Sequence, residues 1–404
     1  MSISKIGKAV GESVTLKLNQ TAAMLKAKGE PIIHLGGGEP KSKAPIEAIE
    51  SAVALVKTGE VRYGPAGGTP DMKKAVVKYT TDYYKYDVKP ENVIASGGAK
   101  QSIMVALQAI LDPGDEVVYP VPYWVSYPDM VKLCGAVPVQ VKPKDGSFYP
   151  TLKDIESVCT SKTKIIIINS PNNPSGAMYS EKFVSEMVNF CEKSEIYLIM
   201  DDIYHRLIFE GRKLVSAFEF LKRSLDDSKL IVINGASKQY AMTGFRIGWA
   251  VAGKTLIKVM TNIQGHQTSG PSNIAQVAAV SAINGPQTSV EELRLSLEEN
   301  TKVMMEQLAT IPGVKATKPD GTFYCFADFS HFDKNSTRLA YFLLEKVLVI
   351  SVPGIEFGLD GYLRLSTCGS GKDITEGIQR IRWALDPKSP KEFYIGERKL
   401  VKDW

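Results

Sequence analysis

The segment LIVINGASKQYAMTGFRIG, residues 230–248, contains the pattern that decides the fold. It opens with a short apolar run, residues 230–233, and continues into a loop of small and hydroxyl residues. Two earlier segments, 165–168 (IIII) and 196–200 (IYLIM), are equally apolar and also lead directly into polar residues. Continuous apolar runs of this length are typical of parallel strands that are buried on both faces of a sheet. We therefore predict a parallel sheet that includes these three segments.

Outward from this segment, predicted strands alternate with predicted helices. Further strands are expected at 92–96, 116–119, 137–141 and 247–252, with helices at 101–111 and 181–193 between them. This alternation favours an α/β architecture. After residue 285 the pattern changes to a long amphipathic helix, 290–308, followed by strands near 321–328 and 362–366 and helices near 338–346 and 373–385. We expect a second, smaller α+β domain there, and a polar surface tail over residues 386–404.

The composition excludes several classes of protein. The chain has 404 residues, of which 44% are hydrophobic and 23% charged, as in ordinary soluble proteins. Its net charge of +5 is too mild to indicate a nucleic-acid-binding protein. Neither a membrane-spanning apolar stretch nor the apolar core of a secretory signal is evident. Because the five cysteines are scattered, we expect reduced thiols and a cytoplasmic location. The four histidines lie far apart without ligand spacing, so no metal site is predicted.

Polar side chains follow three of the predicted strands at the point where each strand ends. The segment 170–176 follows the first strand, 201–204 follows the second, and a loop with Lys238 and Arg246 follows the third. Ligands of doubly wound sheets bind outside the carboxyl ends of the strands, so these groups are expected to meet at one site. Small residues let backbone N–H groups approach an anion, and Arg246 can grip it bidentately. The alternative for this loop alone is a solvated surface lysine.

Seven motifs in order resemble the pyridoxal-phosphate-dependent class I/II aminotransferases of fold type I. They are GGAKQSI (97–103), LDPGDEV (111–117), PYWVSYP (122–128), NSPNNPSG (169–176), DDIYHRLIFEG (201–211), SKQYAMTGFRIGWA (237–250) and YLRLS (362–366). The resemblance covers about residues 13–385 and is closest to the aspartate aminotransferase branch of thermophilic bacteria and archaea.

The resemblance implies a three-layer α/β fold. A large domain over residues 46–285 would hold pyridoxal phosphate on a mainly parallel, seven-stranded sheet. Residues 1–45 would form an N-terminal arm and part of a smaller α+β domain, and 286–404 the remainder of that domain with the tail. The family also implies a homodimer with active sites at the interface, and no nucleic-acid or membrane partner.

The resemblance assigns catalytic roles to a few residues. Lys238 resembles the lysine that forms the Schiff base with the cofactor and then moves the substrate proton. Asp201 resembles the carboxylate that pairs with the pyridinium nitrogen. Tyr204 and Asn173 resemble the donors to the phenolic oxygen of the ring.

The remaining cofactor-binding residues would surround the phosphate and the ring. Ser237, Arg246 and the backbone of Gly98 and Ala99 resemble the phosphate cradle, at the N-terminus of the helix 101–111 where an anion is favoured. Lys100 is expected beside this cradle as well. Trp124 resembles the aromatic residue that stacks on the ring, and Tyr63 the tyrosine that reaches the phosphate of the partner subunit.

Substrate-binding residues are also implied. Arg364 resembles the arginine that binds the α-carboxylate, helped by the backbone N–H of Gly38, and the substrate would also contact Trp124 and Asn173. Lys100, with Ser13 and Thr15, resembles the group that binds the distal carboxylate of a dicarboxylic amino acid; the alternative is that Lys100 faces only the phosphate or solvent.

Two positions depart from the family pattern. Gly235 occupies a position where many relatives have a serine, so one phosphate hydrogen bond would be missing. Ala99 replaces a glycine of close relatives, which is tolerated if its φ is negative.

These assignments predict a ping-pong aminotransferase. L-Aspartate would give oxaloacetate, and 2-oxoglutarate would then give L-glutamate. An aromatic or prephenate aminotransferase is the alternative within the family. A non-catalytic regulator with an aminotransferase-like domain is disfavoured, because the match from about residue 13 leaves no room for a DNA-binding module and the catalytic set is complete.

Overall fold

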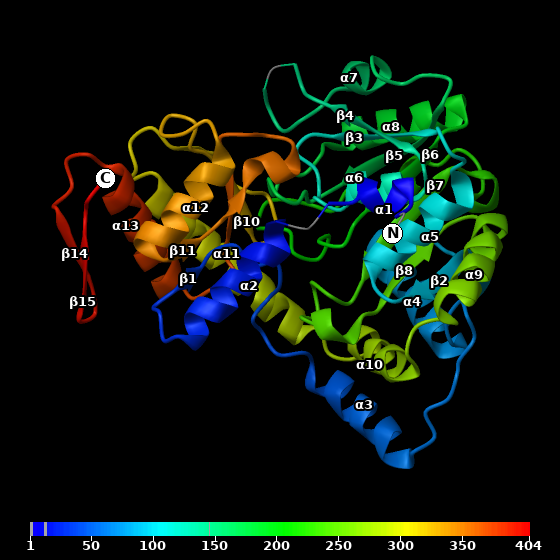
Figure 1. The fold of residues 1–404 in the computed structure, drawn as a ribbon. Helices are drawn as coiled ribbons and strands as arrows, with labels where there is room; N and C mark the ends of the chain where they lie inside the picture. Colours follow the sequence, from blue (N-terminus) through cyan, green and yellow to red (C-terminus); the bar gives the residue numbers. More distant parts are fainter. Residues whose placement is uncertain (1–2, 12–13, 145) are drawn as a thin grey trace.

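The computed structural model describes residues 3–11, 14–144 and 146–404. Its largest feature is a seven-stranded sheet in the order β2-β8-β7-β6-β5-β3-β4 (Figure 1). The strands are β2 (Val93–Ser96), β3 (Glu116–Pro120), β4 (Val137–Val141), β5 (Thr163–Asn169), β6 (Tyr197–Asp201), β7 (Leu230–Gly235) and β8 (Gly248–Val251). All neighbours are parallel except for β8, which is antiparallel to both β2 and β7. The predicted mainly parallel, seven-stranded sheet is confirmed.

Helices cover both faces of this sheet because its strands are apolar on both sides. Alternate residues of one strand enter different cores: Ile166 and Ile168 belong to one buried cluster, and Ile165 and Ile167 to the other. The first cluster includes helices α3 (Ile46–Thr58), α4 (Pro70–Tyr84), α8 (Glu181–Ser194) and α10 (Asn273–Asn284). The second includes α5 (Ala99–Ile110), α6 (Tyr127–Leu133) and α9 (Lys254–Thr268). The result is the expected three-layer α/β arrangement.

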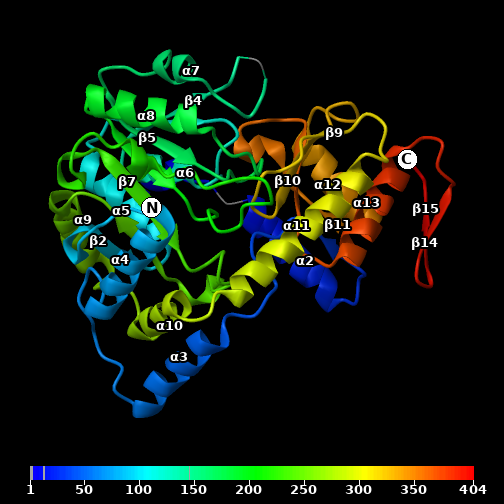
Figure 2. The same ribbon diagram turned by 180° about the vertical axis from the view of Figure 1, so that it is seen from behind.

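A smaller α+β unit is built from both ends of the chain. A four-stranded sheet has the order β12-β13-β10-β9, and β1 pairs separately with β11. The strands are β1 (Ile33–His34), β9 (Lys315–Ala316), β10 (Tyr324–Asp328), β11 (Val349–Ile350), β12 (Val352–Pro353) and β13 (Tyr362–Ser366). The main helices are α2 (Val14–Ala27), α11 (Thr288–Leu308), α12 (Ser336–Val347) and α13 (Gly371–Leu385), with short helices α1 (Lys5–Ala9) and α7 (Leu152–Glu156) elsewhere. Figure 2 shows this unit beside the large sheet, seen from behind. The domain boundaries at residues 45 and 285 stay predictions.

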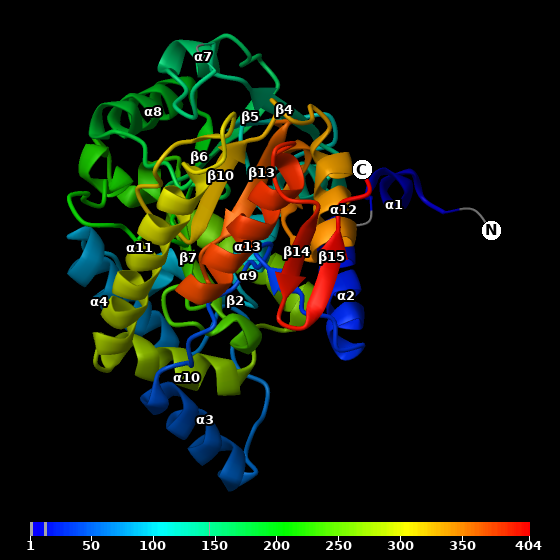
Figure 3. The ribbon, with the colours of Figure 1, turned by 90° about the vertical axis from the view of Figure 1, so that its left-hand side faces the viewer.

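The polar segment at the end of the chain lies on the surface, as expected, and has a regular structure there. After α13 it forms a hairpin of β14 (Glu392–Ile395) and β15 (Arg398–Val401), which lies beside α13 in Figure 3. The Trp383 ring on α13 contacts Phe393 of the hairpin and Trp404 at the chain end, with ring centroids 5.4 and 5.5 Å apart. Arg398 pairs with Glu30 near the start of the chain. These aromatic contacts, which the polar composition of the segment concealed, bind the tail to the small unit.

Within the described residues, no helix is both long enough and apolar enough to cross a membrane.

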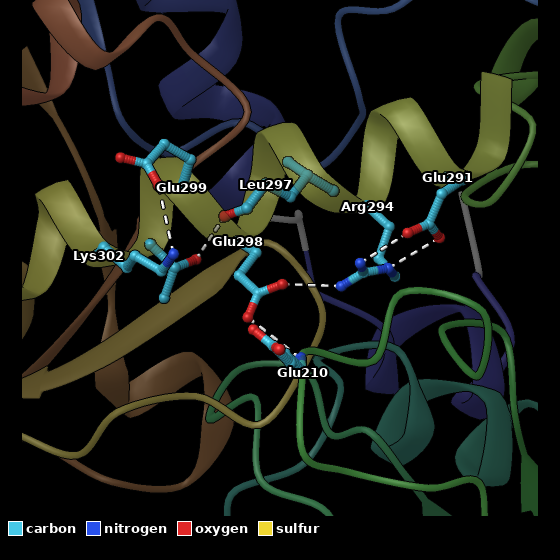
Figure 4. Close-up of polar contacts among 8 residues, drawn as sticks. Glu210, Glu291, Arg294, Leu297, Glu298, Glu299 and Lys302 are labelled. Atoms are coloured by element: carbon cyan, nitrogen blue, oxygen red, sulfur yellow. Dashed lines mark hydrogen bonds and ion pairs between the residues drawn. The ribbon is translucent and has the colours of Figure 1, made fainter. Parts of the chain in front are cut away.

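Helix α11 crosses between the two units, and Figure 4 shows the polar contacts that fasten it. Arg294 donates to Glu298 at 2.7 Å and to both carboxylate oxygens of Glu291 at 2.7 and 2.9 Å. Glu298 in turn accepts the backbone N–H of Glu210, in the large unit, at 3.1 Å.

Loss of Arg294 is expected to destabilise the protein. Replacing Arg294 with methionine would leave the buried carboxylate of Glu298 without a cation. We expect this change to lower the free energy of unfolding by about 2–4 kcal/mol. Urea unfolding measures this loss. Lys302→Ala on the same helix, which removes only the exposed 3.4 Å contact with Glu299, is the control and should cost at most about 0.5 kcal/mol. Equal losses for the two variants would contradict this account.

Candidate active site

A cavity of about 740 Å³ lies between the carboxyl ends of the large sheet and the strands of the small unit. Its walls come from segments far apart in the sequence: the loop after β1, the start of α5, the ends of β5, β6 and β7, and strands β10 and β13. Of the residues predicted from the sequence, eleven line this cavity: Gly38, Ala99, Lys100, Trp124, Asn173, Asp201, Tyr204, Ser237, Lys238, Arg246 and Arg364. The strand ends therefore do meet at one place, as the doubly wound arrangement requires.

Lys238 follows β7 and points its amine into the cavity. Its Nζ donates a hydrogen bond to the carbonyl oxygen of Gly38 at 2.6 Å. Burial lowers the pKa of Lys238 to about 8, with the charges of Arg364 and Arg246 acting in the same direction. An amine with this pKa is partly unprotonated near neutral pH, so it can act as a nucleophile or as a general base.

Asp201 ends β6 and faces the same cavity. Its Oδ2 accepts the hydroxyl proton of Tyr127 at 2.7 Å, and its Oδ1 accepts the backbone N–H of Ile203 at 3.4 Å. Burial raises the pKa of Asp201 to about 6, against the opposing effect of these two donors and of Lys238. A buried carboxylate that has donors on both oxygens, and no ion-pair partner among the described residues, is suited to receive a cationic or protonated ring nitrogen from a ligand.

The neighbouring carboxyl group, Asp202, is in a different environment. It is not among the residues that line the cavity, and Tyr84 donates to its Oδ2 at 3.1 Å among the described residues. Burial raises the pKa of Asp202 to about 8, with the charge of Asp201 acting in the same direction. Two adjacent carboxyl groups are thus separated in pKa, and Asp201 is the one that is charged near neutral pH.

Arg364 is held with its guanidinium across the cavity. Its Nη1 donates to Asn173 Oδ1 at 3.0 Å and its Nη2 to the carbonyl oxygen of Gly36 at 3.1 Å. Its Cζ lies 4.3 Å from the centroid of the Tyr324 ring, and the Tyr324 hydroxyl is 3.4 Å from that of Tyr204. A buried, planar, permanently charged group on the wall of a cavity is suited to a ligand carboxylate. The Nε atom of Arg364 is buried without a partner among the residues that the structure describes.

The start of α5 and the loop after Lys238 form a cradle for an anion. Gly98 caps α5 with a φ of 99°, and a Cβ there would lie 2.6 Å from Nη2 of Arg246. Arg246 donates to Thr243 O at 3.1 Å and to Gly97 O at 3.2 Å, which keeps its guanidinium beside the helix start. A Cβ on Gly248 would be 2.3 Å from the Ala99 nitrogen, so the strand and the helix start can approach only through a glycine. Backbone N–H groups, a helix N-terminus and an arginine together favour a phosphate.

The two departures from the family pattern have physical explanations. A Cβ at Gly235 would lie 3.0 Å from the Cα of Gly248 and 3.1 Å from the Ile247 carbonyl, so a serine there requires β8 to move. Ala99 is the first residue of α5 and is not among the described residues with positive φ.

Some predicted residues lie outside this constellation. The Tyr63 side chain is 93% exposed on the isolated chain and is not part of the cavity wall. Ser13 lies outside the described residues. Thr15 belongs to α2, but its side chain is outside the description. Lys100 lines the cavity with its Nζ 4.9 Å from the centroid of the Trp124 ring, and none of the described carboxylates forms an ion pair with it.

Sequence reasoning missed several residues that the fold brings to the site. Asn19, His34, Glu39, Thr243 and Tyr324 also line the cavity. Glu39 accepts the Thr243 hydroxyl proton at 2.7 Å, which joins the loop after β1 to the loop after β7. Tyr127 was inside the motif PYWVSYP, but nothing in that motif indicated its bond to Asp201. Such contacts join segments far apart in the chain, so only the fold reveals them.

A family model described as aminotransferase class I and II matches residues 30–381. The chain belongs to that family. The resemblance expected from its motifs is thereby confirmed, and the chain is an aminotransferase, an enzyme that acts on amino acids and 2-oxo acids. Members of the family generally depend on pyridoxal phosphate.

Individual relatives cover nearly the whole chain. The aspartate aminotransferase of Bacillus subtilis is 37% identical over 96% of this chain and 100% of its own length. A probable aspartate/prephenate aminotransferase of Aquifex aeolicus is also 37% identical, over 93% of this chain and 96% of its own. Among solved structures, aspartate aminotransferase from Thermus thermophilus with maleate matches with a TM-score of 0.89 at 33% identity, covering 95% of this chain and 99% of that one.

The anion cradle can be tested by placing one methyl group in it. Gly98→Ala adds a methyl group that would collide with Arg246, so we expect the affinity for inorganic phosphate to fall at least about tenfold, as for a lost hydrogen bond to a charged group. Isothermal titration of the cofactor-free protein measures this affinity. Gly114→Ala is the matched control, because Gly114 also has a positive φ of 92° but its Cβ would meet no described atom within 4 Å. Unchanged phosphate binding in Gly98→Ala would contradict the assignment.

Proposed function

We propose that this aminotransferase uses pyridoxal 5′-phosphate and transfers the amino group of L-aspartate to 2-oxoglutarate by ping-pong exchange. The observation that supports this most strongly is that one cavity unites Lys238, Asp201 and Arg364, three groups of complementary chemistry. L-Aspartate would leave as oxaloacetate, and 2-oxoglutarate would then leave as L-glutamate.

The donor set fits pyridoxal phosphate group by group. The phosphate would lie against the start of α5, at Gly98 and Ala99, and would contact Ser237, Arg246 and Lys100. Asp201 would face the ring nitrogen, Asn173 and Tyr204 the phenolic oxygen, Trp124 the ring, and Lys238 the aldehyde. Bound there, the cofactor would supply an electron sink for the charge that develops at the substrate Cα.

The chain's own residues then perform the remaining tasks. Asp201, fixed by Tyr127, keeps a negative charge beside the ring nitrogen. Arg364 binds the α-carboxylate with the backbone of Gly38 and so orients the Cα–H bond, with Trp124 and Asn173 beside it. The Nζ atom of Lys238 takes the proton from the Cα of aspartate and, in the second half of the exchange, gives a proton to the Cα of the glutamate that forms. Its pKa of about 8 is suited to both transfers.

The choice of aspartate rests on Lys100 and on the relatives. Lys100 is a cation of the cavity wall without a carboxylate partner among the described residues, so an acidic substrate side chain would offset its charge. Ser13 and Thr15 are proposed to complete this contact. The Thermus structure was solved with maleate, a dicarboxylate, and several relatives are named aspartate aminotransferases. The name of the Aquifex relative favours prephenate as the second candidate substrate.

The assembly and the location are also proposals. Three apolar residues of α3, Ile46, Val53 and Val56, are exposed on the isolated chain, as is Tyr63. Exposed apolar residues on one helix, together with an exposed tyrosine, support a homodimer in which Tyr63 reaches the partner's phosphate. The five cysteines are free in the described structure, which supports a reducing, cytoplasmic compartment.

Removal of the Lys238 amine should abolish turnover. In Lys238→Ala, aspartate-dependent formation of oxaloacetate should fall by at least about 10⁴-fold, because nucleophile and base are lost together. The absorbance band that reports a covalent lysine–cofactor link should disappear, although the cofactor still binds weakly. Lys254→Ala, which alters an exposed lysine paired with Asp226, should leave both readouts unchanged. Full turnover in Lys238→Ala would refute the proposed mechanism.

The substrate assignment predicts a selective loss in Lys100→Ala. We expect kcat/KM for aspartate to fall roughly 10- to 100-fold, the range for a lost charge-assisted hydrogen bond. The value for alanine, which has no distal carboxylate, should stay within about threefold, whereas a loss confined to cofactor affinity would place Lys100 at the phosphate only. An unaltered aspartate rate, or a wild-type preference for aromatic over acidic amino acids, would overturn the choice of aspartate.

A further inference from the structure

His34 is a titratable residue of the cavity wall that the mechanism above does not use. It ends the short strand β1, which pairs in parallel with β11, and the chain then turns into the loop 36–38. In this loop, the carbonyl oxygen of Gly36 accepts a hydrogen bond from Arg364, and that of Gly38 accepts one from Lys238. His34 therefore stands two residues before the first of these contacts.

The imidazole connects this loop to the N-terminal helix. Nε2 of His34 donates to Oδ1 of Asn19 in α2 at 3.0 Å, and both side chains line the cavity. On its other side the ring lies against the glycine loop, where a Cβ on Gly37 would be 3.9 Å from Nδ1. The pair thus spans the gap between α2 and the loop that holds the substrate arginine.

The surroundings of His34 favour its neutral form. Burial is the main cause of its lowered pKa, and three cations add to it: Lys41 after the loop, Arg364 on β13 and Lys26 on α2. A neutral imidazole that donates from Nε2 keeps a single, defined hydrogen bond to the Asn19 carbonyl. The Nε2–H group can donate to Asn19 whether or not Nδ1 is protonated, so the bond itself does not depend on this pKa.

Apart from the bond to His34, the contacts between α2 and the small unit that the structure describes are mainly apolar. Its buried residues, Leu18 and Ala22, pack in a small cluster with Leu344 and Ile350 of the small unit. Apolar contacts of this kind are not directional, whereas a hydrogen bond fixes both distance and orientation. The helix begins at Val14, so its position decides where its first residues lie relative to the cavity.

We propose that the His34–Asn19 pair is a specificity-determining positioning element, which holds the start of α2 over the cavity so that the acidic side chain of the substrate is bound. This inference rests on the proposed aspartate aminotransferase function. The pair acts on the binding of the distal carboxylate, through the position of α2, and leaves cofactor binding and the proton transfer at Lys238 unaffected.

The test uses binding rather than turnover. Maleate, an unreactive dicarboxylate, and acetate, a monocarboxylate, are titrated into the cofactor-loaded protein by calorimetry. His34→Ala and Asn19→Ala should each weaken maleate binding about tenfold, the usual effect of one lost hydrogen bond, and leave acetate binding and the cofactor Kd unchanged. The double variant should be no worse than either single one, because both remove the same contact. His34→Gln, whose amide can still donate to Asn19, should recover part of the affinity.

A second readout follows the helix itself. Lys17 and Lys26 of α2 are exposed, so trypsin cleavage after them reports how firmly the helix is held. Maleate should slow this cleavage in the wild-type protein and in the control His331→Ala, whose histidine lies on the surface of the small unit, but not in His34→Ala.

The outcomes separate the two proposals. If the wild-type protein binds maleate no better than acetate, the aspartate assignment itself fails. If the wild-type protein prefers maleate and His34→Ala keeps that preference, the positioning role is wrong. An equal loss of maleate, acetate and cofactor affinity would show that His34 has only a structural role, which also overturns the inference.

Discussion

The carbonyl oxygens of Gly36 and Gly38 accept hydrogen bonds from Arg364 and Lys238, which approach from the small unit and from the large sheet. Two cations would repel each other across a cavity, and each needs an acceptor when it is removed from water. One glycine-rich loop meets both needs with backbone atoms alone, so no acidic side chain is needed to neutralise the groups that must later bind substrate. The placement of this loop by β1 thus sets how Arg364 and Lys238 lie relative to each other in the site.

The two carboxyl groups at the end of β6 illustrate how a site separates similar groups. Asp201 and Asp202 are consecutive, and burial raises the pKa of both, yet only Asp201 faces the cavity. Asp202 instead accepts a hydrogen bond from the Tyr84 hydroxyl, and that hydroxyl accepts one from the side-chain amide of Asn234. The Asn234 amide is also hydrogen-bonded to His205, which extends this buried network. Because such a network satisfies its members internally, it can support the strand end without competing for a ligand.

The sequence predicted the sheet and most of the site for a definite reason. Strands buried on both faces are uniformly apolar, so the runs at 165–168, 196–200 and 230–233 were visible without a structure, and polar residues after each run marked the edge where they meet. The hairpin of β14 and β15 was not predicted, because its stability depends on the ring of Trp383 in α13. The bonds of Asn19 with His34 and of Tyr127 with Asp201 were invisible for the same reason: each joins segments whose proximity only the fold creates. Tyr63 remains a prediction, since a partner subunit would be needed to meet it.

The pairing of β1 with β11 also constrains how the protein is made. Ile33 and His34 find their strand partners at Val349 and Ile350, and Glu30 finds Arg398 close to the end of the chain. At ordinary rates of translation the first residues therefore wait on the order of tens of seconds before their partners leave the ribosome. The large sheet, whose strands all lie between Val93 and Val251, can form during that time. The active site cannot be completed until β11 and β13 have also left the ribosome and the two halves of the small unit can meet.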